Sequence, residues 1–255
     1  MHIGHNIIHF DHLPSTNVFA LDLLSKSKPP EGTVISTDYQ FSGKGQLNNK
    51  WESEANKNIT LSVILYPQFL PIDKQFALNQ MVSLAVQKTI YDIIQDSVLI
   101  KWPNDIYIGR NKVAGILIQN QIKGKKIQSA VIGIGINVNQ ENFLSSASNP
   151  ISLVHLIQEH INLQESKNKL YFHLQVYYKL LMDACFDELT DQYLENLYLR
   201  DTISEFCKDD GTPFQGMIKG VDELGRLQIL IGQELKTFMF KEIKFLNSKS
   251  KGYLK

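Results

Sequence analysis

The sequence predicts an α+β fold, in which a mixed, largely antiparallel sheet with helices precedes a small C-terminal β-barrel. One observation is a block of neighbouring strand-like segments with short turns between residues 98 and 139, which favours antiparallel pairing. Another is a series of short, closely spaced strand-like segments late in the chain. With 255 residues, 43% of them hydrophobic, the chain can bury one large and one small core.

The first half of the chain alternates between strand and helix patterns. Ser15, Thr16 and Asn17 are good N-caps and precede a helical pattern at 18–24. Apolar residues at helical spacing predict a second helix at 78–94. Strands are expected at 7–10, 33–36 and 59–63, and a polar loop at 38–51.

The second half contains the strand block, a helical segment and the predicted barrel. Strands are expected at 98–100, 106–108, 113–118 and 127–139, and mostly helix at 151–199. Barrel strands are expected at 213–221, 227–231 and 238–240, and a frayed tail at 248–255. We therefore predict a catalytic domain at 1–195 and a small domain at 196–255, with the boundary near Asn196.

Bulk properties exclude several classes of protein. The formal net charge is +0, from 26 basic and 26 acidic side chains, unlike the strongly basic charge of a dedicated nucleic-acid binder. The N-terminal residues lack the order of a signal peptide, and no apolar run is long enough to span a bilayer. Two cysteines make a poor disulfide framework. A soluble cytoplasmic protein that binds neither nucleic acid nor membrane is expected.

The segment from Lys101 to Asp105 is the most informative part of the chain. It reads Lys-Trp-Pro-Asn-Asp and stands between two strand-like segments. Proline fixes φ and removes a backbone donor, so the break between the strands has a defined shape. A cation, an aromatic ring, an amide and a carboxylate on such a rigid turn suit a binding site, although an ordinary loop between strands is the alternative.

The loop from Gln40 to Trp51 offers anion-binding chemistry. Gly43 and Gly45 let backbone amides approach an anion, and Lys44 and Lys50 add positive charge on either side of Gln46. Trp51 could provide a flat apolar wall. The loop matches neither a Walker A sequence nor a dinucleotide-binding fingerprint, and a solvated surface loop is the alternative.

Two further patterns lie on predicted strands. Lys112 at the start of one strand could direct charge into a cleft, where Gly115 would leave space for a ligand. Gly133 and Gly135, followed by Asn137, interrupt an apolar strand, which indicates either close approach of a ligand or a structural bulge.

Other candidate residues are weaker. The spacing of His2, His5, His9 and His12 fits no familiar metal-binding pattern, and surface or strand histidines are expected. Neither Cys185 nor Cys207 stands beside a convincing histidine partner, and 209–211 reads as a turn.

Taken together, these patterns occur in one order and closely resemble the biotin protein ligases, also called biotin–[acetyl-CoA-carboxylase] ligases. The resemblance runs from about Phe10 to Asn139, and the Lys-Trp-Pro-Asn-Asp and Lys-x-x-Gly pairing carries it. It implies a mixed sheet related to class II aminoacyl-tRNA synthetases and an SH3-like C-terminal barrel. It also implies an ATP-dependent, Mg²⁺-dependent enzyme that joins biotin to AMP and then passes biotin to a lysine of a biotin carboxyl carrier protein.

The resemblance also implies roles for the site residues. Lys112 would contact both the biotin carboxylate and the phosphate, with Lys44, Asn104 and Asp105 completing the catalytic set and Asp105 as a magnesium ligand. The ureido head of biotin would be bound by Ser15, Thr16 and Gln40, with backbone help from Gly115. The remaining binding residues would be Asn17, Gly43, Gly45, Gln46, Trp51 beside the adenine, Lys101, Trp102 against biotin, Gly133, Gly135 and Asn137 near the nucleotide.

Three points stay open in the sequence. Lys44, Gln46 and Asn48 stand where the family usually has arginine, arginine and glycine, which puts the grip on the adenylate in question. Some members begin with a helix-turn-helix, whereas this chain begins almost at the first strand, so we expect a ligase without DNA binding. Whether it forms a homodimer stays open. The alternatives are a lipoate ligase or octanoyltransferase of the same fold, and a non-catalytic biotin or nucleotide sensor.

Overall fold

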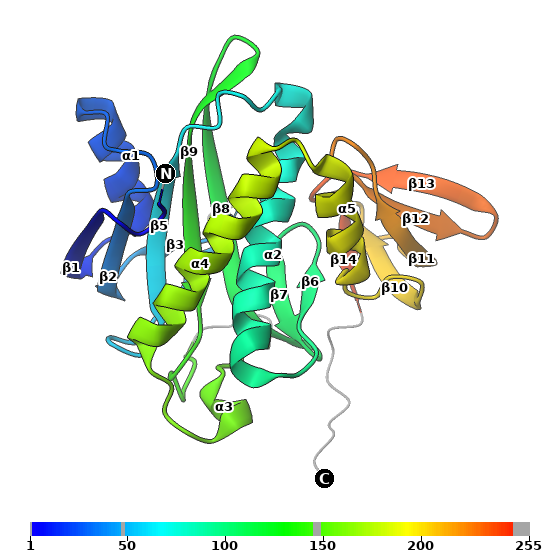
Figure 1. Cartoon of the computed structure of the whole chain (residues 1–255). Coiled ribbons are helices and arrows are strands. Elements are labelled where there is room, and N and C mark those ends of the chain that lie inside the picture. Colours follow the sequence, from blue (N-terminus) through cyan, green and yellow to red (C-terminus); the bar gives the residue numbers. More distant parts are fainter. Residues whose placement is uncertain (1, 47–48, 145–148, 247–255) are drawn as a thin grey trace.

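A seven-stranded sheet forms the centre of the computed structural model, which describes residues 2–46, 49–144 and 149–246 (Figure 1). The strand order is β1-β2-β5-β9-β8-β7-β6. The bounds are β1 Ile7–Leu13, β2 Val34–Gln40, β5 Ile59–Leu65, β6 Leu99–Lys101, β7 Asp105–Ile108, β8 Asn111–Lys123 and β9 Lys126–Ile136. Only β1 and β2 pair in parallel, because helix α1 (Thr16–Lys26) connects them, and the other neighbours pair antiparallel.

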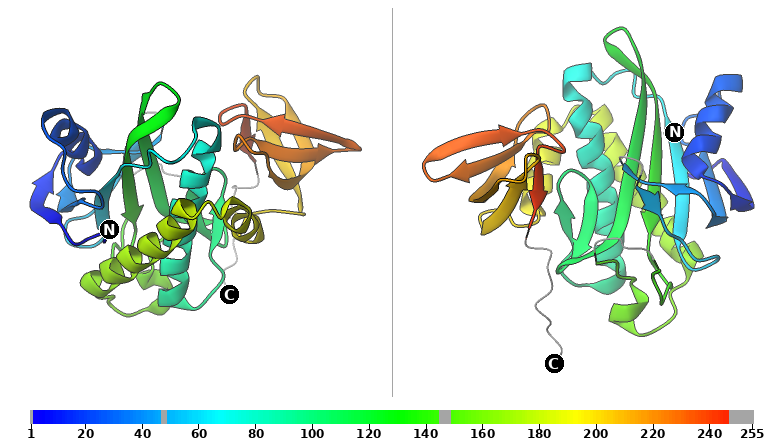
Figure 2. Two further views of the ribbon diagram at one scale, coloured as in Figure 1. Left: turned by 45° about the horizontal axis from the view of Figure 1, so that its top comes forward. Right: turned by 180° about the vertical axis from the view of Figure 1, so that it is seen from behind.

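Helices cover both faces of this sheet. Consecutive strand residues point to opposite faces, so Val34 and Val63 pack beneath helices α2 (Gln75–Ile94) and α4 (Leu163–Met182). Their neighbours Ile35 and Ile64 pack with α1 on the other face (Figure 2). Smaller elements are η2 Ile72–Lys74, α3 Val154–Ile157 and the two-stranded ribbon of β3 Gly43–Lys44 and β4 Lys50–Trp51.

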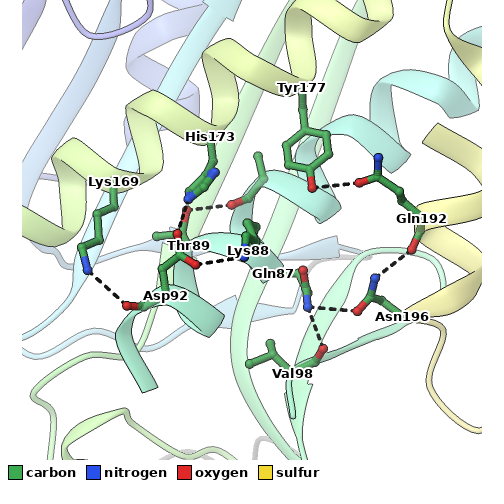
Figure 3. Close-up of polar contacts among 11 residues, drawn as sticks. Gln87, Lys88, Thr89, Asp92, Val98, Lys169, His173, Tyr177, Gln192 and Asn196 are labelled. Carbon is green, nitrogen blue, oxygen red and sulfur yellow. Dashed lines mark hydrogen bonds and ion pairs between the residues drawn. The ribbon is translucent and has the colours of Figure 1, made fainter. Parts of the chain in front are cut away.

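A cluster of polar contacts ties α2 to α4 (Figure 3). Asp92 accepts from His173 at 2.7 Å and pairs with Lys88 at 3.1 Å, while its backbone carbonyl accepts from Lys169 at 3.2 Å. Burial alone would raise the pKa of Asp92, but the hydrogen bonds from Lys88 and His173 outweigh it and lower that pKa. At pH values above the usual pKa of an aspartate, the charged Asp92 carboxylate therefore stabilises the contact between α2 and α4. This stabilisation is lost as the pH falls through the lowered pKa of Asp92.

The C-terminal part is a second, five-stranded antiparallel sheet, reached through helix α5 (Phe186–Glu195). Its strand order is β13-β12-β11-β10-β14. The bounds are β10 Ile203–Lys208, β11 Pro213–Val221, β12 Leu227–Ile231, β13 Glu234–Phe238 and β14 Ile243–Phe245. Figure 1 shows this sheet beside β6 and α5, at the opposite side of the molecule from β1.

The turn between β6 and β7 joins the two sheets. The indole nitrogen of Trp102 donates to the carbonyl of Gly225 at 2.9 Å, and its ring meets Phe240 edge-on. The Tyr193 hydroxyl donates to the carbonyl of Pro103 at 2.9 Å. Only 6% of Trp102 is exposed, so this residue fixes the C-terminal sheet against the strand block.

The predicted fold class is confirmed: a mixed, largely antiparallel sheet is followed by a small antiparallel β unit. Three local predictions were wrong. The predicted loop at 38–51 contains the end of β2 and the ribbon β3–β4, and the predicted strand at 127–139 ends at Ile136. The third C-terminal strand is 234–238 rather than 238–240, because β13 is an edge strand with four exposed residues and shows no apolar alternation.

Strands β10 and β14 were missing from the sequence prediction, and the predicted tail at 248–255 lies outside the described residues. In the described part of the chain, no helix is both long and apolar enough to cross a membrane.

Candidate functional site

A cavity of about 430 Å³ lies between the large sheet, the β3–β4 ribbon and the C-terminal sheet. Its volume is in the range of small-molecule sites. The lining includes fifteen of the residues proposed from sequence: Ser15, Thr16, Asn17, Gln40, Lys44, Gly45, Gln46, Trp51, Lys101, Trp102, Asp105, Lys112, Gly115, Gly133 and Gly135. Residues spread over more than a hundred positions are therefore brought together.

The start of α1 and the end of β2 form one end of the cavity, which we call the neutral end: Ser15, Thr16, Asn17 and Gln40. All four residues are buried, with exposed fractions of 3 to 7%. The Thr16 amide donates to Gln40 Oε1 at 2.7 Å, and the Thr16 hydroxyl lies 3.2 Å from the same oxygen. Behind them, Ser62 Oγ lies 2.7 Å from Thr16 Oγ1 and 2.6 Å from Asn17 Oδ1.

Two polar groups of the neutral end are left for a ligand. Ser15 is the N-cap of α1, yet its hydroxyl makes no capping hydrogen bond. In the part of the chain that is described, the amide nitrogen of Gln40 likewise donates to no protein acceptor, while its oxygen is held by Thr16. A neutral ligand group that both donates and accepts hydrogen bonds would satisfy these atoms.

Glycines on β8 and β9 form the floor of the cavity. Gly115 pairs with Gly135 in regular register, so the predicted alternative of a bulge at these glycines was wrong. A Cβ at Gly115 would lie 3.0 Å from the Trp51 ring, and one at Gly135 would overlap that ring. A Cβ at Gly133 would overlap the Asn17 side chain. Because these positions lack a Cβ, the side chains of Trp51 and Asn17 can lie directly against the strands and form walls of the site.

Five lysines also line the cavity, and we call the part of the site that they form the cationic end: Lys44, Lys50, Lys101, Lys112 and Lys244. Asp105 is the one carboxylate among the described residues that line the cavity. Lys112 Nζ lies 2.6 Å from Asp105 Oδ1, and both side chains remain about one-third exposed, at 29% and 34%. Asp105 also pairs with Gly115 across the sheet, which places this ion pair beside the glycine floor.

Lys101 is the most enclosed of these lysines. Its ammonium group donates to the Tyr107 hydroxyl at 3.2 Å and lies over the rings of Tyr107 and Phe245. Burial lowers the pKa of Lys101, an effect that Asp105 opposes and Lys112 reinforces. A bound anion would therefore relieve an unfavourable positive charge at this position.

Three residues proposed from sequence do not line the cavity: Gly43, Asn104 and Asn137. The buried Asn104 donates to the carbonyl of Ile116 at 3.1 Å and accepts from Gln46 at 3.0 Å, so it supports the loop that does line the cavity. The Asn137 amide donates to the carbonyl of Ile151, and its Oδ1 is buried without a partner. Asn48 of the same loop lies outside the described residues.

The C-terminal sheet supplies residues that the sequence analysis did not propose. Phe240, Ile243, Lys244 and Phe245 close the cavity beside Lys101. Their contribution depends on how the small sheet docks against Trp102, and no local pattern in the sequence signals that docking. Lys50 was noted for its charge alone.

Comparisons with known proteins identify relatives of this chain. A model described as the biotin/lipoate A/B protein ligase family matches residues 9–137. The bifunctional ligase/repressor BirA of Bacillus subtilis is 37% identical over 139 residues, which are 54% of this chain and 42% of that protein. The chain thus spans less than half the length of this curated relative.

Two further relatives are instructive. The biotin–[acetyl-CoA-carboxylase] ligase of Paracoccus denitrificans is 31% identical over 130 residues, 49% of this chain and 51% of that protein. The solved biotin protein ligase from Aquifex aeolicus, in complex with biotin and ATP, aligns with a TM-score of 0.78 at 22% identity. It covers 94% of this chain and 98% of that one, so the likeness of fold includes the C-terminal sheet.

Proposed function

Because this chain belongs to the biotin/lipoate A/B protein ligase family, we propose that it activates biotin with ATP and transfers biotin to a carrier protein. The observation that carries this proposal is the division of one cavity into a neutral end and a cationic end. A substrate that fits both has a neutral hydrogen-bonding head and an anionic tail, and the further lysines suit the phosphate groups of ATP.

The neutral end suits the ureido group of biotin. This group both accepts and donates hydrogen bonds, and the Ser15 hydroxyl and the Gln40 amide nitrogen are available to it. The dithiolane ring of lipoate does neither, so it would cover these polar atoms and leave them unpaired. Each such loss costs about 1–3 kcal/mol, which favours biotin.

The cationic end suits the first chemical step. A carboxylate oxygen of biotin attacks the α-phosphorus of ATP, a new P–O bond forms, and the bond to pyrophosphate breaks. Both partners are anions, so positioned positive charge is the main requirement. We assign Lys112 to the point where carboxylate and phosphate would meet, and Lys44 and Lys101 to the phosphate groups. Trp51 would lie beside the adenine. All four residues line the cavity.

Asp105 is the residue that would hold Mg²⁺. Magnesium is commonly bound by one or two carboxylates together with substrate phosphates, and the cavity offers one carboxylate of this kind. Bound there, the ion would neutralise phosphate charge during the displacement. Asn104 is turned toward Ile116 and Gln46, so we assign it to positioning the turn rather than to the metal.

In the second step, the amine of a carrier lysine attacks the carbonyl carbon of biotinyl-5′-AMP, an amide bond forms, and AMP leaves. The lysines that stabilise the attacking carboxylate and the phosphate would then stabilise the departing AMP. We assign this chemistry to a catalytic domain at 1–195, with a small domain at 196–255 that contributes Lys244 to the cavity.

An ATP–pyrophosphate exchange assay tests the first step. Biotin with Mg²⁺ should support exchange, whereas lipoate should be disfavoured by about 10⁴-fold. Comparable exchange with both acids would favour a lipoate ligase, and binding without exchange would favour a sensor. The second step is tested by adding a biotin carrier domain and measuring the expected mass gain on its lysine.

A further inference from the structure

The free edge of the seven-stranded sheet carries a cluster of metal-binding side chains. Strand β1 is the edge strand, and it pairs in parallel with β2. His9 and Asp11 stand two residues apart on β1, and therefore on one face, and Asp38 lies on β2 beside them. One ligand-type atom from each of the three lies within 4.8 Å of the other two.

The imidazole of His9 is held in a fixed orientation. Its Nδ1 lies 3.0 Å from the hydroxyl of Ser36, which is only 2% exposed. Its Nε2 consequently faces Asp38 Oδ2 at 3.2 Å. A hydrogen bond to one ring nitrogen that aims the other at the ligand position is the usual support of a metal-binding histidine.

The carboxylates around His9 form a negatively charged surround that suits a cation. When Nδ1 donates to Ser36, the lone pair of Nε2 is directed at carboxylate oxygens, which are themselves acceptors. In the described part of the chain, Asp38 has no ion-pair partner except His9, and Asp11 has none. In that tautomer, a metal ion between Nε2 and the two carboxylates would satisfy all three groups. In the other tautomer, Nε2–H donates to Asp38 and Nδ1 accepts from the Ser36 hydroxyl.

We propose that His9, Asp11 and Asp38 bind a first-row divalent cation such as Zn²⁺. Imidazole and carboxylate are ligands that Zn²⁺ accepts at about 2.0–2.2 Å, which sets ligand atoms about 3.0–3.6 Å apart. The His9–Asp38 distance of 3.2 Å already meets this spacing. Asp11 has an exposed side chain and can close the remaining gap by a rotamer change, with water completing the coordination.

The position of the site gives it a structural consequence. Strand β1 leads directly into Ser15 and Thr16, and β2 ends at Gln40, so the ion would join the two strands that deliver the neutral end of the cavity. An ion that binds only the folded chain raises its unfolding temperature. This inference is independent of the proposed ligase activity.

Calorimetric titration and thermal unfolding test the proposal on the full chain after treatment with a chelator. The variants His9→Ala and Asp11→Asn remove ligands from exposed positions, and His12→Ala is the matched control on the same strand. Cys185 and Cys207 are present in every variant, so any zinc that they bind is a constant background.

The wild type and His12→Ala should bind one more equivalent of Zn²⁺ than His9→Ala. Binding of this equivalent should raise the unfolding temperature of the wild type and of His12→Ala, and His9→Ala should show no such rise. Asp11→Asn should bind it at least about tenfold more weakly, because a charged ligand is lost. Equal zinc binding and equal thermal shifts in wild type and His9→Ala would overturn the proposal. So would loss of the site in His12→Ala with retention in His9→Ala.

Discussion

At one end of the cavity, Thr16 and Gln40 are buried and bonded to each other, whereas at the other end Lys112 and Asp105 are charged and partly exposed. The neutral end would select its ligand, because donors and acceptors that a ligand covers are costly to leave unpaired. The cationic end gathers five lysines around one carboxylate and suits any ligand with suitable negative charge. Selectivity and chemistry are therefore expected to depend on different ends, and substitutions can separate them.

The largest effect is expected at the cationic end. Lys112→Ala should lower the rate of adenylate formation by about 10²–10³-fold, the scale on which removal of one positioned electrostatic group slows a reaction. Pyrophosphate exchange measures this rate. Lys123→Ala, at the far end of the same strand and outside the cavity, is the control. A rate within about three-fold of wild type would contradict the assigned role.

The next largest effect is expected at the neutral end. Gln40→Ala removes the acceptor of the Thr16 amide and should weaken biotin binding by about 5- to 150-fold, equivalent to about 1–3 kcal/mol. ATP binding should change little. Calorimetric titration with each ligand distinguishes the two, and the exposed Gln68→Ala serves as control. Equal loss of affinity for both ligands would mean that the two ends are not separable.

A smaller effect is expected from the C-terminal sheet. Lys244→Ala should weaken ATP binding by about 1.5- to 5-fold, because an exposed ion pair contributes about 0.2–1 kcal/mol. The difference should shrink as salt is added. Lys241→Ala, which changes a neighbouring exposed lysine outside the cavity, is the matched control. If both variants behave alike, the small sheet does not contribute charge to the site.

The smallest effect concerns pH. Burial lowers the pKa of Lys101, so its positive charge should be lost at a lower pH than that of an ordinary lysine. ATP affinity should fall about two-fold more between about pH 8 and about pH 10 than in Lys101→Arg, whose guanidinium stays charged. Biotin affinity should follow the same course in both proteins, because Lys101 is assigned to the phosphate groups of ATP and not to the biotin carboxylate. Parallel ATP curves for the two proteins would exclude Lys101 as the titrating group.

Patterns of neighbouring residues explain why so much of the site could be predicted. Lys101 to Asp105, Lys112 to Gly115 and the glycines at 133 and 135 each stand on a strand or tight turn, where local spacing determines which residues share a face. Asn104 shows the limit of this reasoning. Its position in the turn was predictable, but its bonds to Ile116 and Gln46 depend on packing between segments.

Residues that act across distant segments were missed or judged weak. The spacing of His9 along the chain fits no metal-binding pattern, because its partner Asp38 comes from the neighbouring strand. Lys244 and Phe245 were missed because their place in the cavity follows from the docking of Trp102 against Gly225. Strand β13 was shifted because exposed edge residues carry no apolar period.

The sequence alone determined the α+β class, the antiparallel strand block and most of the cavity-lining residues, because apolar periodicity and turn chemistry act over a few residues. Tertiary structure alone decided that Trp51 lies on the Gly115–Gly135 floor, that Lys244 joins the cationic end, and that His9 meets Asp38. These contacts join segments from 29 to more than a hundred residues apart, since they follow from strand order and sheet docking, which no short pattern encodes.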